Sequence, residues 1–77
     1  MMRKVFVESS NVESLQYSRS AKELIVTFNS GRSYASTPVP LKVAGAMAFS
    51  DSVGKFLNRE IKPNYNYKEV FDQQPVG

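Results

Sequence analysis

Residues 23–36 read ELIVTFNSGRSYAS, and this segment predicts the centre of the fold because it holds two strands and the turn between them. Residues 23–28 alternate between two faces and are rich in β-branched side chains, which favours a strand. Residues 29–31, Asn-Ser-Gly, predict a hairpin turn, with Gly31 suited to a positive φ. Residues 32–36 then return as the paired antiparallel strand.

Two further strands are predicted before this hairpin. Met2–Val7 carries three consecutive apolar residues, and Val12–Ser18 alternates in polarity. Ser9-Ser10-Asn11 separates them, because these side chains compete for backbone hydrogen bonds and favour turns. After the hairpin, the two prolines of Thr37–Pro40 stop the sheet, since proline cannot donate to a ladder.

The second half of the chain predicts two short helices, Pro40–Phe49 and Val53–Ile61. Phe56 is expected at the centre of the second helix's apolar face. Residues 64–71 form an extension that packs back or pairs with another chain, and residues 72–77 are expected to fray. The predicted fold is therefore α+β, with an antiparallel sheet of about four strands followed by two short helices.

The composition indicates one globular domain spanning residues 1–77, since 42% of the residues are hydrophobic and 22% are charged. The chain has no Cys and no His. Disulfides, thiol nucleophiles, the usual general base and the commonest metal ligand are therefore excluded. We predict no enzyme, no metal and no cofactor. We do not expect a catalytic set in the three carboxylates Glu8, Glu13 and Glu23, because the sequence offers no partner that would adjust their acidity for acid–base catalysis.

The net charge of +3 favours anionic partners weakly. No segment resembles a membrane span or a signal peptide, so no membrane partner is expected. A Cys-free chain fits a reducing compartment, and a cytoplasmic location is predicted. So small a domain has a thin core, and burying more surface in a homo-oligomer would stabilise it.

An ordered series of residues resembles the KTSC domain, named for the C-terminal domain of some lysyl-tRNA synthetases and found in short bacterial and phage proteins. The series is Val7-x-Ser9-Ser10-x-Val12, Tyr17, Leu24-x-Val26-x-Phe28-x-x-Gly31-x-x-Tyr34, Val39-Pro40, Ser52-x-Gly54-Lys55-Phe56-Leu57-Asn58-x-x-Ile61 and Tyr65. It covers residues 5–67 and implies a small antiparallel sheet followed by two helices. The synthetase context suggests RNA binding. The family's middle strand often carries a Tyr-x-Tyr pair; Tyr34 matches, and Ser36 stands at the second position.

A first candidate site is the turn Ser50–Lys55. The free N–H groups at a helix start suit a phosphate, and Ser52, Gly54 and Lys55 would contact it. The alternative is an ordinary helix cap, in which the negative charge of Asp51 already stabilises the positive end of the helix dipole.

A basic stripe is the second candidate. Lys55, Arg59 and Lys62 recur at i, i+4 and i+7 of the predicted second helix and could follow a phosphate backbone. The alternative is a solvated helix face. Asn58 lies beside the stripe, where it would read a base or ribose edge or bond a neighbouring turn.

Aromatic side chains form the third candidate. Four tyrosines and an arginine offer stacking surfaces for bases, although aromatics on strands more often pack in the core: Tyr17, Tyr34, Tyr65, Tyr67 and Arg32. Tyr34 with Arg32 is the first choice, because alternation puts both on one strand face. Tyr17 and Tyr65 complete the predicted base-contact set.

These observations predict a non-enzymatic binding module for a phosphate-bearing ligand, either RNA or a nucleotide. One alternative is a phage-type homo-oligomeric sponge that sequesters nucleotide signals in pockets between subunits. The other is a protein–protein interaction module whose basic stripe docks an acidic partner.

Overall fold

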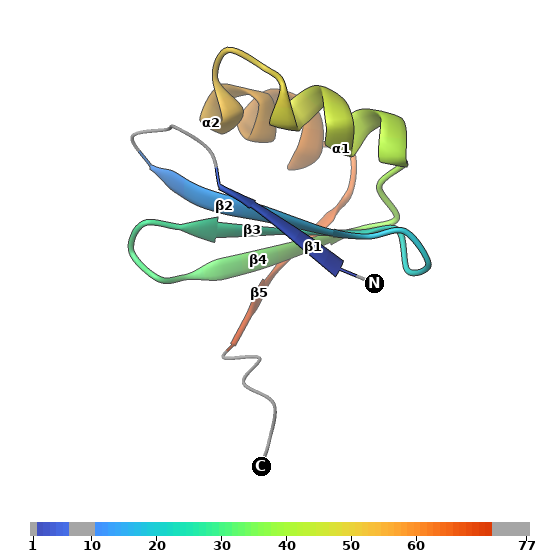
Figure 1. Cartoon of the computed structure of the whole chain (residues 1–77), viewed down its shortest axis with the longest axis horizontal. Helices are drawn as coiled ribbons and strands as arrows, with labels where there is room; N and C mark the ends of the chain where they lie inside the picture. Colours follow the sequence, from blue (N-terminus) through green and yellow to red (C-terminus); the bar gives the residue numbers. More distant parts are fainter. Residues whose placement is uncertain (1, 7–10, 72–77) are drawn as a thin grey trace.

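The computed structural model describes residues 2–6 and 11–71 of the chain. Its elements, in order, are β1 (Met2–Phe6), β2 (Val12–Ser18), β3 (Glu23–Phe28), β4 (Ser33–Thr37), α1 (Leu41–Ala48), α2 (Val53–Phe56), the π-helical η1 (Leu57–Ile61) and β5 (Asn66–Val70). The helices lie together on one face of the sheet (Figure 1). The predicted α+β class, an antiparallel sheet followed by two short helices, is confirmed.

The sheet is a meander, with strand order β1-β2-β3-β4-β5 and every neighbouring pair antiparallel. The predicted hairpin joins β3 to β4. Gly31 has a φ of 97°, which L side chains rarely adopt, and its N–H donates to the Phe28 carbonyl at 2.9 Å. The residue types of the turn therefore fix the place where the chain reverses.

The chain leaves the sheet after Thr37, as the two prolines predicted. The Val39 N–H still donates to the Lys22 carbonyl at 2.7 Å, which holds this connection against the sheet. Pro40 occupies the cap position, one residue earlier than the first helical residue of α1, and its carbonyl accepts from the N–H groups of Val43 and Ala44. A proline suits this position because it has no N–H to leave unpaired.

The C-terminal extension differs from a simple tail, because it supplies a fifth strand. β5 pairs with β4 in the same chain, so the sheet has one strand more than the expected four. This pairing settles the choice between packing back and joining another chain in favour of packing back. The predicted frayed tail, residues 72–77, lies outside the described residues, as does Val7 at the predicted end of β1.

The second helix corrects the prediction of a regular α-helix from Val53 to Ile61. Only the four residues of α2 are α-helical, and the chain then widens into the π-helix η1. The Lys62 N–H donates to the Leu57 carbonyl, five residues back, at 2.9 Å. No helix among the described residues is long and apolar enough to cross a membrane.

The core lies between the sheet and the helices. Its buried apolar residues are Val12, Leu15, Leu24, Val26, Val39, Ala44, Met47, Val53, Leu57 and Ile61. Leu57 and Ile61 anchor the second helical segment, whereas Phe56 is only half-buried at the edge of this core. The expectation that Phe56 is the centre of the helix's apolar face was wrong by one residue, and Leu57 holds that place.

Candidate functional site

Three aromatic side chains meet on the helix-facing side of the sheet. Tyr34 lies opposite the buried Val26 in the register of β3 and β4, so both point toward the helices. The Tyr34 and Tyr67 rings are stacked, with centroids 4.9 Å apart and an interplanar angle of 3°. The Phe28 ring meets Tyr34 edge to face at 5.6 Å. Three neighbouring strands thus each contribute one ring to a single row.

Two cationic side chains flank this row. The Lys62 ammonium, just after η1, lies 5.2 Å from the centroid of the Tyr67 ring. Arg32 and Ser30 come from the β3–β4 hairpin. Together with the three rings they line one open hollow of about 320 Å³, which we call the aromatic hollow: Phe28, Ser30, Arg32, Tyr34, Lys62 and Tyr67.

The polar groups of the aromatic hollow suit an anion. Its lining has two cations, two phenols and a hydroxyl, all of which can donate hydrogen bonds. No carboxylate among the described residues lines it; Glu69 lies opposite Tyr34 in the β4–β5 register but is not part of the lining. The hollow therefore combines flat apolar surface with two cations and no carboxylate in its described lining.

Tyr67 is the titratable group that the fold perturbs at this site. Burial, and to a smaller extent the neighbouring Tyr34 phenol, raise the pKa of Tyr67 to about 12. The Tyr67 phenol consequently keeps its proton at neutral pH and remains a hydrogen-bond donor.

The predicted phosphate site at the start of the second helix differs from the aromatic hollow in its balance of charges. Ser52 accepts a hydrogen bond from the Lys55 N–H at 3.3 Å, so its hydroxyl caps the helix. A second hollow of about 400 Å³ lies here, lined by Ser50, Asp51, Ser52, Lys55, Phe56, Arg59 and Glu60. Because two carboxylates face two cations, this hollow carries no excess positive charge.

The basic stripe is divided between the two hollows. Lys55 and Arg59 line the second hollow, and Lys62 belongs to the aromatic hollow. The i→i+5 bonding of η1 changes the angular step along the helix, so the 3.6-residue period no longer holds between Arg59 and Lys62. Asn58 is exposed and Gly54 is half-buried, and neither lines either hollow.

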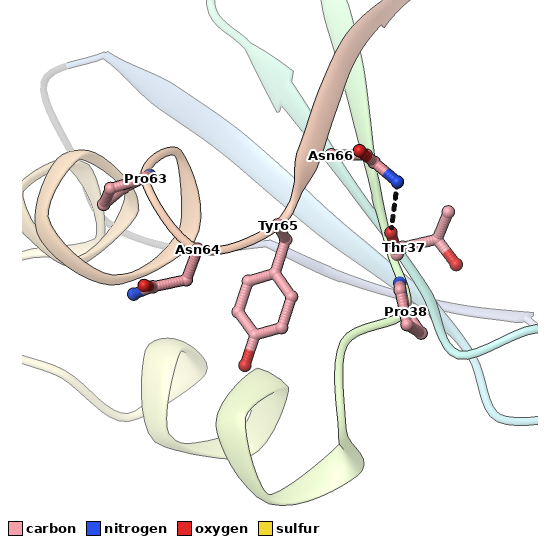
Figure 2. A pocket seen from close by; sticks show the side chains of 6 residues that line it. All are labelled: Thr37, Pro38, Pro63, Asn64, Tyr65 and Asn66. Atoms are coloured by element: carbon pink, nitrogen blue, oxygen red, sulfur yellow. Dashed lines mark hydrogen bonds between the residues drawn. The ribbon is translucent and has the colours of Figure 1, made fainter.

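Tyr17 and Tyr65 do not join the aromatic hollow. The Tyr17 hydroxyl donates to the Val39 carbonyl, and its ring packs against the core. Tyr65 lines a third hollow of about 450 Å³ with Thr37, Pro38, Pro63, Asn64 and Asn66. Figure 2 shows its ring directed toward α1, away from the sheet. Both tyrosines therefore serve packing in this fold.

Sequence reasoning selected Arg32, Tyr34 and Lys62, which the structure brings together, but assigned Lys62 to a separate stripe. It named Tyr67 among the possible stacking surfaces but left it out of the base-contact set, and it did not name Phe28 or Ser30. A signal for Tyr67 was present, because residues 65–68 alternate in polarity as a strand does. Its stacking on Tyr34 also needs the register that pairs β5 with β4.

Two of the three carboxylates that were considered as an acid–base set lie in described strands. Glu13 lies at a register shift in β2, Glu23 lies at the start of β3, and Glu8 is outside the described residues. Within the described part of the chain, no group of three or more His, Cys, Asp or Glu side chains could hold a metal ion.

Comparison with known proteins gives a consistent picture. The family model of the KTSC domain matches residues 8–65. A protein of Stutzerimonas stutzeri (strain A1501), described as uncharacterized, is 37% identical over 70 residues, which are 90% of this chain and 99% of that protein. The crystal structure of a KTSC domain protein from Yersinia pestis superposes with a TM-score of 0.82 at 24% identity, covering 91% of this chain and 99% of that one. The chain described here therefore belongs to the KTSC domain family.

Proposed function

We propose that this protein is a non-enzymatic binding module for a nucleotide unit, either free or within single-stranded RNA, and that the aromatic hollow is its site. One observation carries the proposal: the stacked Tyr34 and Tyr67 rings line the same hollow as two cations, Arg32 and Lys62. Flat apolar surface and positive charge are what a base and its phosphate require together.

The arrangement supports a division of roles. In the proposed complex, the base stacks on the aromatic row while Arg32 and Lys62 contact the phosphate. Lys62 is exposed and lies over the Tyr67 ring, and its flexible stem lets the ammonium move from the ring to a phosphate. The Tyr67 phenol stays neutral and donates a hydrogen bond.

Binding without catalysis fits the chemistry of the lining. A general base works best when its pKa lies near the working pH. The pKa of the Tyr67 phenol in the lining is raised to about 12, far from neutrality. The proposal therefore assigns recognition, and no reaction, to this hollow, and it assigns the activity to the cytoplasm, where nucleotides and RNA are abundant.

Titration of the purified protein with a short single-stranded RNA and with linear and cyclic nucleotides, across a series of salt concentrations, tests this proposal. With two cations on an RNA backbone, log K falls against log salt with a slope of about −1.4, taking about −0.7 per phosphate contact. A free nucleotide bound by stacking and directed hydrogen bonds shows a weaker salt dependence and a strong dependence on Tyr34 and Tyr67.

Matched variants identify the site. Arg32→Ala and Lys62→Ala are expected to weaken binding, and each lowers the RNA slope by about 0.7. Arg59→Ala removes the same charge from the second hollow and is expected to leave binding unchanged. The opposite pattern, in which Arg59→Ala weakens binding and Lys62→Ala does not, would place the ligand at the helix start.

The same titration separates the alternatives. Tight, salt-insensitive binding of a compact nucleotide by a dimer or larger assembly would favour the sponge that holds nucleotides between subunits. Folded protein that binds none of these ligands at low salt contradicts the proposal and leaves the protein-docking interpretation.

A further inference from the structure

Helix α1 exposes a large apolar residue at each of its two ends. Ala44 and Met47 are buried against the core. Leu41, the first helical residue, is 52% exposed, and Phe49, which caps the helix, is 91% exposed. Lys42 lies on the side opposite Ala44 and Met47. In Figure 1 the sheet lies on one side of α1, and no other labelled element covers the outer side.

Gly45, in the middle of α1, has no packing role inside the chain. A Cβ atom placed on Gly45 would meet nothing within 4 Å. A glycine inside a helix weakens it relative to alanine, so its presence is unexplained by the monomer. Leu41, Gly45 and Phe49 follow one another at intervals of four residues, which puts them along one line of the helix surface.

We propose that this outer face of α1 is a contact between two copies of the chain, packed antiparallel about a two-fold axis at Gly45. Leu41 and Phe49 are each four residues from Gly45, so the axis brings Leu41 of one copy beside Phe49 of the other. The glycines at the crossing point let the helices approach closely, and the large side chains pack on either side of it.

Charge complementarity favours a second copy as the occupant. Lys42 lies in the first turn of α1, Asp51 lies just after its end, and both are exposed. Antiparallel packing brings Lys42 of each copy toward Asp51 of the other. The helix itself has no acidic residue in its first turn and no basic residue in its last turn. In the antiparallel pair, the C-terminus of α1 in one copy lies beside the N-terminus of α1 in the other copy. The opposite partial charges of these two helix ends then offset each other.

Sedimentation equilibrium over about 1 µM to 1 mM tests the contact, a range that covers the affinity of a small interface. The average mass is expected to rise from 8.6 kDa toward twice that value. Phe49→Asp is expected to raise the dissociation constant by about 100-fold, since two phenyl rings leave each contact. Phe71→Asp is the matched control, because Phe71 is also exposed, at 77%, but lies beyond β5.

Two further variants test the antiparallel arrangement. Gly45→Leu adds a side chain whose Cβ meets nothing within 4 Å in the monomer, and it is expected to block dimerisation. Lys42→Glu and Asp51→Lys each weaken the dimer, and the double variant restores it.

A mass that stays at 8.6 kDa up to the highest concentration overturns the proposal and leaves the face for another partner. Equal loss of dimer with Phe71→Asp and with Phe49→Asp also overturns it. Failure of the charge exchange to restore the dimer rejects the antiparallel register. The test needs no ligand, so its outcome is independent of the proposed nucleotide site.

Discussion

At the scale of single residues, Tyr67 takes the place that the family pattern assigns to a second tyrosine in β4. Ser36 stands at that position, and it lies directly opposite Tyr67 in the β4–β5 register. Ser36 is 1% exposed, so its small side chain leaves room on the crowded helix-facing side. Tyr67 then supplies the ring that stacks on Tyr34. The stacked pair of this chain is therefore formed across β4 and β5.

The raised pKa of Tyr67 predicts a loss of stability at alkaline pH. The folded protein keeps this proton up to about pH 12, whereas the unfolded chain releases it near pH 10.0. Between these values the folded state binds more protons than the unfolded state, so the free energy of unfolding decreases as pH rises. Urea denaturation at several pH values above 9 measures this decrease, and Tyr67→Phe, which lacks the phenol, should show a shallower one. Equal slopes would contradict the assignment.

Ser36 itself predicts a stabilising substitution. Its hydroxyl oxygen is buried and has no hydrogen-bond partner among the described residues. Ser36→Ala removes an unpaired polar group without creating a large cavity, and it should raise the free energy of unfolding by about 1 kcal/mol. Ser36→Tyr, which restores the family's pair, should overpack the site and lower it by about 1–3 kcal/mol. Thermal unfolding of both variants checks the two signs; destabilisation by Ser36→Ala would show that the hydroxyl is paired.

At the scale of elements, the second helical segment predicts a difference between two neighbouring positions. Leu57 is 1% exposed, whereas Phe56 is half-buried at the rim of the second hollow. Leu57→Ala should lower the free energy of unfolding by about 2–5 kcal/mol, which approaches the whole stability of so small a domain. Phe56→Ala should lower the free energy of unfolding by clearly less, although phenylalanine is larger than leucine. A melting-temperature decrease for Phe56→Ala equal to or greater than that for Leu57→Ala would restore Phe56 as the core residue.

The elements also show how far the sequence alone could lead. The β3–β4 hairpin and the break at Pro38 and Pro40 were predictable, because each depends on local backbone chemistry of glycine and proline. The π-helix η1 was not, because its residues have ordinary helical spacing and the wider turn leaves no signal in residue type. β5 was left as an extension because its partner, β4, is about 30 residues earlier in the chain, and long-range pairing is not encoded in a short window.

Long-range pairing also limits how much of the candidate site could be predicted from the sequence. Arg32 and Tyr34 were predictable as neighbours because strand alternation puts them on one face. Their meeting with Lys62 and Tyr67 depends on the β4–β5 register and on the direction in which η1 ends. Residue types thus suggested candidate side chains, and the tertiary fold decides which of those residues meet.

At the scale of the whole molecule, the thin core and the exposed face of α1 lead to one prediction about stability. If two copies pack through α1, dimerisation stabilises the folded state by mass action, so the melting temperature depends on protein concentration. For a domain of this size, about 1 kcal/mol changes the melting temperature by about 4–8 °C. Differential scanning calorimetry between about 10 µM and 1 mM should therefore show a rise of several degrees. The melting temperature of Phe49→Asp should not change with protein concentration. That of Phe71→Asp should rise with concentration as it does for the unmodified chain. A melting temperature of the unmodified chain that does not change with concentration would show that the folded unit is the monomer.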